Sequence, residues 1–535
     1  MPYVLAHDVG TTGDKATLYD ESGALVCSAF VGYPTSCPYT GWAEQRPQDW
    51  WLALVESTRA LLRESGVAPA EIAVVAFSGQ MMAAVAVDAA GEPVRDAIIW
   101  ADQRAVREVE QVGERVDPHR VYEVTGHRLS PSYSAAKIRW IQTNEPDRYA
   151  ATHAFLQAKD FLVARLTGEF VTDRSDASGT NLYDLRGGGW SAELVEAFGV
   201  DPAKLPRICD STEVVGEIGA RAASEVGLRA GTPVVIGGGD GACAGVGAGV
   251  IGEGVAYNYI GSSSWIALAT SEPILDPEER TFTWAHLIPG MFSPCGTMQA
   301  AGGSYQFARD LFAGHEMVVA ERLGRSTYEI MNEELLGSPP GARGLLFLPY
   351  LLGERSPRWN PHARGAFVGL TIRHRQPDLF RAVLEGITLN LRVILEAFVR
   401  QGAAIESIRV IGGGAQGAVW NQIMADVFGI PVQRLTLLEE ATSMGAAVAG
   451  GVGVGIWKDF SQVDRMVQIA GEVRPRAELA PLYDELYAIF DETYAALENA
   501  SIFRRLEAID GGQPSVTGAG DAGGGSEAVL ARQIP

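Results

Sequence analysis

The sequence predicts an α/β protein whose two domains face each other across a cleft. At 535 residues the chain is too long for a single hydrophobic core. Strand-like apolar runs alternate with helix-like segments along the chain, as α/β layers require. Residues 3–9 and 254–269 each open one half of the chain with a strand-like run and a turn of small residues. We therefore expect two similar layered units.

The first half begins with a strand over residues 3–9. A hairpin should follow over 16–30, because Asp20-Glu21-Ser22-Gly23 is a turn sequence between two apolar runs. Pro47 marks the start of a helix that continues to Leu62, since proline is favoured in a first helical turn. Residues 72–77 form the next expected strand, and the loop 78–82 follows it.

The second half should contain a helix over 378–399, a strand over 407–411, a glycine turn over 412–414 and a helix over 420–428. We place the domains at 1–248 and 249–505, with the glycine-dense stretch between Asp240 and Gly254 as a hinge. Residues 506–535 are rich in Gly, Ala, Ser and Asp. Such a segment buries too little apolar surface to order itself, so we expect a disordered tail.

Composition narrows the function. The formal net charge of −22 argues against nucleic acid and anionic membranes as partners, because both attract basic surfaces. The five cysteines are scattered without a C-x-x-C pair, which suits a reducing cytoplasm better than a disulfide framework or a zinc site. Neither a signal peptide nor a transmembrane run is expected. A nucleotide remains a possible ligand, since loops and Mg²⁺ bind it locally.

Three loops of small residues carry the chemistry: 8–13, 236–241 and 260–264. The second reads Ile-Gly-Gly-Gly-Asp-Gly and holds one carboxylate, Asp240, where glycines allow close approach of a ligand. Phosphoryl transfer needs backbone N–H groups and hydroxyls around a polyphosphate, carboxylates for Mg²⁺ and a base for a hydroxyl proton. The loops supply residues of each kind.

Two longer motifs resemble the FGGY carbohydrate kinases, a family of the actin-like (ribonuclease H-like) ATPase superfamily. One motif runs from Ser132 to Asn144, and the other begins at Gly365 and closes at Glu385. The resemblance covers nearly all of the chain except the tail. It implies an actin-like fold, ATP and Mg²⁺ as co-substrate and cofactor, a small sugar as acceptor and a possible homodimer.

The resemblance assigns roles at the first two loops. It makes Asp240 the general base; the structural alternative is that Asp240 only caps the following helix. Asp8 becomes the Mg²⁺ carboxylate rather than a turn residue. Lys15 would lie near the transferring phosphate, or else be a solvated lysine on the hairpin, and its acidic neighbour Asp14 has no assigned role. The phosphate cradle would consist of Gly10, Thr11 and Thr12.

Two further loops match the nucleotide side of the family. One is the second phosphate loop, Gly261, Ser262 and Ser263, and the other is the adenosine loop, Gly412, Gly413, Gly414 and Ala415. The alternative for both is a plain turn, formed by serine in the first and by glycine in the second.

The sugar side is most similar to pentulose kinases of the xylulose kinase type. Their G-Q-M-H-G loop appears here with methionine and alanine in the last two positions, so Met82 replaces a histidine. Trp100 either stacks on the sugar or fills the core, and Met82 is either pocket wall or core. The expected sugar ligands are Gln80, Met81, Met82, Trp100, Asp102, Arg104 and Asp240. The leading acceptor is a ketopentose such as D-xylulose, phosphorylated on its 5-hydroxyl; ribulose, gluconate, erythritol and glycerol are alternatives.

Two other functions stay open. Gly412-x-Gly414-x-x-Gly417 matches the dinucleotide fingerprint of an oxidoreductase, but the acidic residues Glu439 and Glu440 come late. A non-catalytic nucleotide or sugar sensor on the same fold would be expected to lack the base, and Asp240 is present. No P-loop sequence occurs, so the chain is not a P-loop kinase.

Overall fold

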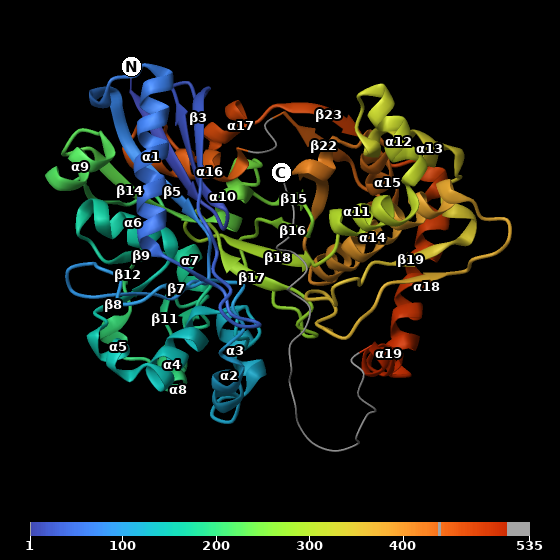
Figure 1. Ribbon diagram of the computed structural model, residues 1–535, viewed down its shortest axis with the longest axis horizontal. Helices are drawn as coiled ribbons and strands as arrows, with labels where there is room; N and C mark the ends of the chain where they lie inside the picture. The colour runs from blue at the N-terminus through green and yellow to red at the C-terminus, as the bar shows by residue number, and fades with distance from the viewer. Residues whose placement is uncertain (1, 437–439, 511–535) are drawn as a thin grey trace.

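Two β-sheets organise the computed structural model, which describes residues 2–436 and 440–510 (Figure 1). The central three strands of the first sheet are parallel, and the predicted hairpin lies beside them in antiparallel pairing. In spatial order the six strands are β13 (Val214–Glu217), β14 (Pro233–Gly239), β5 (Ile72–Gly79), β1 (Tyr3–Val9), β2 (Gly13–Tyr19) and β3 (Leu25–Gly32).

The second sheet repeats this plan. Its first strand in the sequence again carries an antiparallel hairpin on one side and parallel strands on the other. In spatial order the seven strands are β17 (Phe282–Ala285), β18 (Phe292–Met298), β16 (Ser264–Leu268), β15 (Gly254–Ile260), β21 (Ile405–Ile411), β22 (Val432–Leu435) and β23 (Ile469–Val473). The expectation of two similarly built halves is therefore met at the level of topology.

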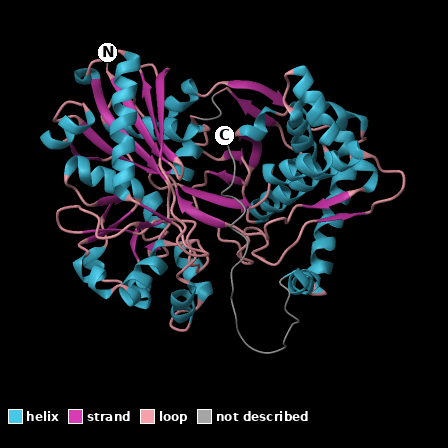
Figure 2. Cartoon of the chain, viewed as in Figure 1, coloured by secondary structure: helices cyan, strands magenta, loops and turns pink. Residues whose placement is uncertain are grey.

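Helices cover the outer face of each sheet (Figure 2). On the first sheet, α1 and α6 pack against the strands and α9 lies beside them: α1 (Pro47–Ser65), α6 (Ala158–Thr167), α9 (Ala220–Val226). The predicted helix from Pro47 is thus confirmed as α1. Around the second sheet lie α11 (Gly302–Phe312), α14 (Gln376–Arg400), α15 (Ala418–Phe428) and α18 (Ala480–Asn499), of which α14 and α15 are the two predicted helices.

Two helices fill the space between the sheets. One is α10 (Asp240–Gly247), whose Cys243 packs toward the first sheet while Ala244 packs toward the second. The other is α16 (Ala441–Gly453), which comes from late in the sequence yet contacts β1, β5 and β14. Glycine allows their close approach, because a Cβ on Gly445 would lie 2.0 Å from the carbonyl oxygen of Cys243. The glycine-dense stretch expected as a hinge is therefore helical over Asp240–Gly247.

Smaller elements complete the chain. The remaining helices are α2 (Val106–Gly113), α3 (Pro118–Thr125), α4 (Ser134–Asn144), α5 (Pro146–Ala151), α7 (Arg174–Ser178), α8 (Ala192–Phe198), α12 (Gly314–Leu323), α13 (Thr327–Glu334), α17 (Val463–Met466) and α19 (Ile502–Asp510). The remaining strands are β4 (Glu44–Gln45), β6 (Val85–Val87), β7 (Ala97–Ile98), β8 (Ala154–Leu156), β9 (Val171–Asp173), β10 (Tyr183–Asp184), β11 (Gly189–Trp190), β12 (Arg207–Cys209), β19 (Leu346–Leu348) and β20 (Ala366–Val368).

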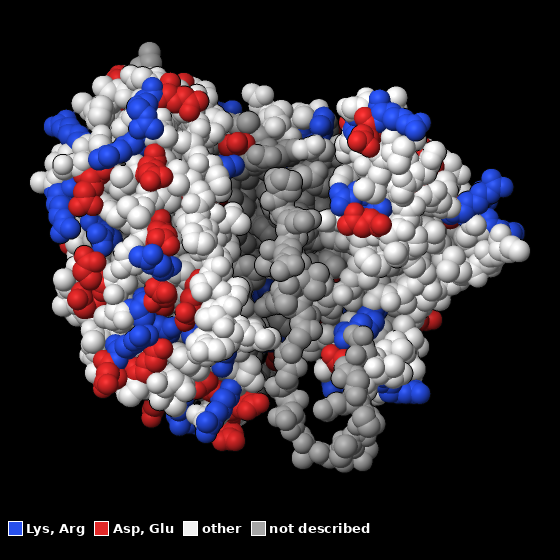
Figure 3. Space-filling view, viewed as in Figure 1, with Lys and Arg blue, Asp and Glu red and all other residues white. Residues whose placement is uncertain are grey.

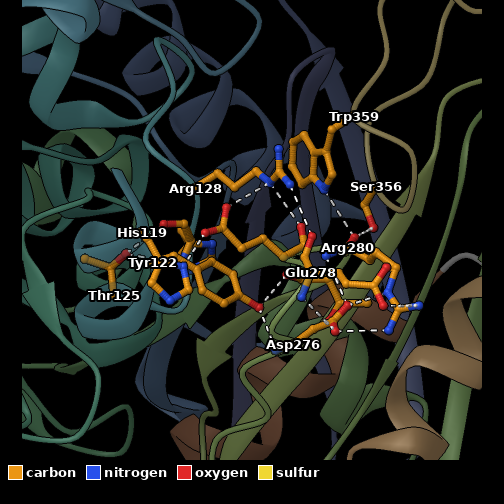
Figure 4. A network of polar contacts seen from close by, with 12 residues as sticks. His119, Tyr122, Thr125, Arg128, Asp276, Glu278, Arg280, Ser356 and Trp359 are labelled. Carbon is orange, nitrogen blue, oxygen red and sulfur yellow. Dashed lines mark hydrogen bonds and ion pairs between the residues drawn. The ribbon is translucent and has the colours of Figure 1, made fainter. Parts of the chain in front are cut away.

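A polar network joins the first half of the chain to the segment that precedes β17 (Figure 4). The hydroxyl of Tyr122 in α3 donates to the carbonyl of Thr281 and accepts the backbone N–H of Asp276. Arg128 donates to the carbonyl of Glu279 at 3.0 Å. These contacts tie helix α3 and the segment after it to the loop that precedes β17.

Residues 506–510, expected as the start of the tail, are helical. Helix α19 continues to Asp510, because Phe503 is buried beside Tyr494 and because Glu507 pairs with His362 and Arg364. The rest of the expected tail, 511–535, lies outside the described residues, as do positions 437–439.

Charges of both signs mix over the face shown in Figure 3. Lys and Arg alternate there with Asp and Glu over the half that contains α1. No helix within residues 2–436 and 440–510 has the length and apolar character needed to span a membrane.

Candidate active site

Asp8 and Asp240 lie at one edge of the first sheet. Parallel strands bring their carboxyl ends to the same edge, and the register aligns Asp8 with Ser78 and Gly239 with Gly79. Asp240 directly follows Gly239. The two carboxylates therefore stand at the ends of β1 and β14, with β5 between them, about 10 Å apart at the backbone if neighbouring strands are spaced normally.

Asp240 is the first residue of α10 and not its cap. Gly239 occupies the N-cap position and contributes no side chain there. The Asp240 carboxylate accepts the backbone N–H of Gly241 at 2.7 Å. Burial, reinforced by the charge of Asp8, raises the pKa of Asp240 to about 7. A carboxyl group with a pKa near neutrality is well matched to accept a proton from a substrate hydroxyl.

Asp8 faces Lys15 across the hairpin. The two residues are register partners in β1 and β2, so their side chains leave the same face of the sheet. Burial raises the pKa of Asp8 to about 6, although a 3.1 Å hydrogen bond from Ser78 and the charge of Lys15 both lower it. Within the described ranges no group of three or more His, Cys, Asp or Glu side chains could hold a metal. A metal here would have Asp8 as its protein carboxylate, which fits Mg²⁺ that keeps its waters and binds phosphate oxygens.

Asp14 points away from this edge. Successive strand residues face opposite sides of the sheet, so Asp14 enters the core while Lys15 lies on the face that carries Asp8. Its carboxylate accepts a 2.6 Å hydrogen bond from Ser57 of α1 and contacts Nδ1 of His7 at 2.9 Å. His7 is fully buried. An acidic residue next to a phosphate loop is thus accommodated by the alternation of the strand.

Side chains from other segments hold the loop after β1 by donating hydrogen bonds to it. Gln80 donates to the carbonyl of Gly10 at 3.2 Å, and Gln45 donates to that of Thr11 at 2.7 Å. The indole N–H of Trp100 donates to the Thr11 hydroxyl at 2.9 Å. Thr12 is exposed at the tip. Gln80 and Trp100, both expected at the sugar, therefore contact the loop after β1, and their contact with sugar stays a prediction.

The other expected sugar ligands divide into two groups. Met81 is buried against the end of β14, because a Cβ added to Gly239 would lie 2.6 Å from the Cγ atom of Met81. Met82 has a φ of 61° and lies near Trp284, because a Cβ on Gly179 would meet both side chains. Met81 therefore lies against the residue before Asp240, whereas Met82 lies beside Gly179 and Trp284.

Asp102 and Arg104 are occupied by protein partners. The Asp102 carboxylate accepts the backbone N–H of Ala43 at 2.6 Å and pairs with Arg104 at 2.7 Å. The Arg104 guanidinium also stacks 3.5 Å from the ring centre of Trp42. This arrangement fixes the loop after β7, and a direct contact of either residue with sugar stays a prediction.

The two nucleotide-side loops follow neighbouring parallel strands of the second sheet. Tyr259 of β15 is the register partner of Ile411 in β21, so loops 261–263 and 412–415 meet at one edge. Gly412 has a φ of 84°, and a Cβ there would lie 2.6 Å from the carbonyl oxygen of Ile260. Gly414 is as tightly placed, because a Cβ there would lie 2.3 Å from Cγ2 of Ile260. Only glycine fits these two positions.

Sequence reasoning missed two parts of the site. The backbone N–H groups of Gly302 and Gly303, at the start of α11, donate to the carbonyls of Gly261 and Ser262. The Gly-Gly pair ahead of an apolar helix was the available signal. The other part is a buried cluster around Lys159, for which the only signal was a lysine within an apolar helix.

The second sheet contacts the first half of the chain next to Asp240. The hydroxyl of Tyr257 in β15 donates to the carbonyl of Gly241, next to Asp240, at 2.9 Å. The indole N–H of Trp265 donates in turn to Tyr257. Asp240, Asp8 and strand β15 of the second sheet thus surround one candidate site between the two halves.

Comparisons with known proteins agree with this architecture. Residues 3–247 match the N-terminal domain of the FGGY family of carbohydrate kinases, and residues 256–454 match its C-terminal domain. The xylulose kinase of Lactococcus lactis is 32% identical over 92% of this chain and 97% of its own. The gluconokinase of Bacillus subtilis is 31% identical over 93% and 96%. The xylulose kinase structure from Rhodospirillum rubrum superposes with a TM-score of 0.86 at 30% identity, over 94% of this chain and all of that chain.

The fold is that of the two-domain actin-like ATPases, as predicted. The chain belongs to the FGGY family of carbohydrate kinases, and it is a sugar kinase. The oxidoreductase alternative is thereby excluded. Its glycine fingerprint is the turn before α15, and Glu440 stands at the start of α16 rather than at the end of a strand.

Proposed function

We propose that the enzyme transfers the γ-phosphoryl group of ATP to the 5-hydroxyl of a ketopentose, with D-xylulose as the leading substrate. The observation that carries this proposal is the buried Asp240 carboxylate. It lies one strand away from Asp8 and has a pKa of about 7. Asp240 accepts the hydroxyl proton as the hydroxyl oxygen attacks the γ-phosphorus, and ADP leaves with the bridging oxygen.

The remaining residues bind and orient. Loops 10–12 and 261–263 hold phosphate oxygens, and loop 412–415 accommodates the adenosine. Lys15 offsets charge on the transferring group. Asp8 would hold Mg²⁺, which supplies charge neutralisation at the phosphates. The reaction belongs in the cytoplasm, where ATP is available, and the five free cysteines suit that compartment.

A sugar acid such as gluconate is the second candidate acceptor. Gluconokinases stand among the relatives at 31% identity, close to the 32% of a xylulose kinase. Met82 also replaces the histidine of the pentulose kinase loop, which removes one polar contact that a ketopentose would use. Ribulose, erythritol and glycerol complete the set of acceptors to be compared.

The test is ADP release with Mg·ATP against a panel of ketopentoses, ketohexoses, polyols and sugar acids. The expected result is sugar-dependent release that is highest for a ketopentose and falls by about 10³-fold or more in Asp240→Asn. Asp484→Asn, which changes an exposed carboxylate on α18, is the matched control and should behave as wild type. Activity retained in Asp240→Asn would show that another group is the base. Binding of sugar and ATP without turnover would favour the sensor alternative.

A further inference from the structure

A buried cluster of four charged side chains lies behind the segment that carries Asp240. The Nζ atom of Lys159 is 2.7 Å from Asp160, 2.8 Å from Asp173 and 3.0 Å from Asp176. None of these side chains is more than 1% exposed. Burying charges is costly even when they are paired, so a cluster of this kind calls for an explanation beyond stability.

One hydroxyl connects the cluster to the base. Asp173 accepts hydrogen bonds from both the hydroxyl and the backbone N–H of Ser175, the latter at 2.7 Å. The Ser175 hydroxyl oxygen in turn accepts the backbone N–H of Gly239 at 2.9 Å. Gly239 is the residue before Asp240. An unbroken chain of contacts therefore runs from Lys159 to the backbone that presents the base.

The end of β14 needs this support. Its ladder to β5 is irregular between Val235 and Gly238, where Gly237 has a φ of 65°. Beyond the irregularity the strand is enclosed on both sides. A Cβ on Gly238 would lie 2.8 Å from the Ser175 hydroxyl oxygen, and one on Gly239 would meet Met81. The Ser175 hydrogen bond thus anchors the strand end just after the regular ladder is interrupted.

Lys159 does not act on substrate directly. Its ammonium group is fully buried and contacts three carboxylates. Burial by itself would lower the pKa of Lys159, but the three carboxylates raise it well above its usual value, so it stays a cation. Lys159 is therefore a buried cation at neutral pH, and Asp173 connects it to the backbone of Gly239 through Ser175.

We propose that Ser175 is a positioning residue for Asp240, and that Asp173 and Lys159 hold its hydroxyl in place. The proposal rests on the proposed role of Asp240 as general base. It predicts that loss of the hydroxyl impairs the chemical step while the binding loops at β1, β15 and β21 remain intact.

The test compares Ser175→Ala with Ser178→Ala in the full-length enzyme. Both serines are buried in α7, but the Ser178 hydroxyl donates to the carbonyl of Ser175 and accepts the N–H of Ala285, with no bond to Gly239. We expect kcat to fall about 10- to 100-fold in Ser175→Ala, with KM for sugar and ATP within about 2-fold, since small misplacements of a reacting group are costly. Ser178→Ala should stay within about 3-fold, and Ser175→Thr, which keeps the hydroxyl, should recover most of the loss.

A second readout separates positioning from a general loss of folded enzyme. Asp8, at the end of β1, and Tyr257, in β15 of the second sheet, are the titratable groups on other elements that interact with Asp240. If Ser175→Ala lets the carboxylate move toward water, the pKa of Asp240 falls from about 7, and the acid limb of kcat/KM moves to lower pH. A loss of rate with an unmoved acid limb, or a loss equal to that of Ser178→Ala, would overturn the proposal.

The same pKa can be followed without turnover. The ¹³C resonance of the Asp240 carboxyl, assigned by its absence in Asp240→Asn, is titrated in wild type and in Ser175→Ala. A lowered pKa in Ser175→Ala supports the positioning role, and an unchanged pKa contradicts it. Lack of sugar-dependent ADP release by wild type would count only against the proposed function, so the two failures are distinguishable.

Discussion

Asp8 and Asp240 stand at the ends of β1 and β14, one strand apart, and the charge of Asp8 is the second cause, after burial, of the raised pKa of Asp240. The two carboxylates differ in their surroundings. The charge of Lys15 lowers the pKa of Asp8, whereas the charge of Asp8 raises that of Asp240, and we propose that Asp8 binds the cation and Asp240 accepts the proton.

The first prediction concerns the pH dependence of turnover. Asp240 must be ionised to accept a proton, and its pKa is about 7 in the folded enzyme. We expect kcat/KM for the sugar to be level above this pH and to fall about tenfold per pH unit below it. Steady-state rates between pH 5 and 9 measure the limb. A profile that stays flat down to pH 5 would contradict a base with this pKa.

The second prediction concerns the metal. Asp8→Asn removes the proposed carboxylate ligand while it keeps the size of the side chain. The Mg²⁺ concentration for half-maximal rate should rise about tenfold or more. Ser78→Ala is the control, since it removes the 3.1 Å hydrogen bond to Asp8 but keeps the Asp8 carboxylate, and it should have a smaller effect. Unaltered Mg²⁺ dependence in Asp8→Asn would rule out this assignment.

The third prediction separates two adjacent residues that face opposite sides of β2. Asp14→Asn weakens the buried contacts with His7 and Ser57, so it should lower the free energy of unfolding by about 1–3 kcal/mol. Lys15→Met should instead lower kcat by about 10²-fold, because it removes a charge proposed to lie at the transferring group. Urea unfolding and steady-state kinetics of both variants provide the comparison. The reverse pattern would show that the two side chains are wrongly placed.

The fourth prediction uses two glycines of the adenosine loop. A side chain at Gly412 would be strained at a φ of 84° and would contact Ile260, whereas nothing lies within 4 Å of a Cβ at Gly413. Gly412→Ala should therefore raise the KM for ATP by about tenfold or more, and Gly413→Ala by much less. Wild-type KM values for ATP and for sugar in both variants would show that the loop does not bind the nucleotide.

Local patterns were enough to predict much of this protein. The strand at 3–9, the helix from Pro47, the long helix that ends near residue 400 and the small-residue loops all depend on periodicity, turn residues and proline placement within a short window. The base candidate was visible for the same reason, since glycines around Asp240 are a local signal. The family motifs then assigned the class of reaction.

Only the tertiary structure decided which side chains meet. Asp14 faces His7 and Ser57 because strand residues alternate between the two faces of the sheet. The Asp102 carboxylate pairs with Arg104 and accepts the backbone N–H of Ala43. Helix α16 packs on strands formed more than 350 residues earlier in the chain, at β1 and β5. Ser175 reaches Gly239 across 64 residues. Contacts between distant segments arise from the packing of whole layers, and no short window of sequence contains both partners.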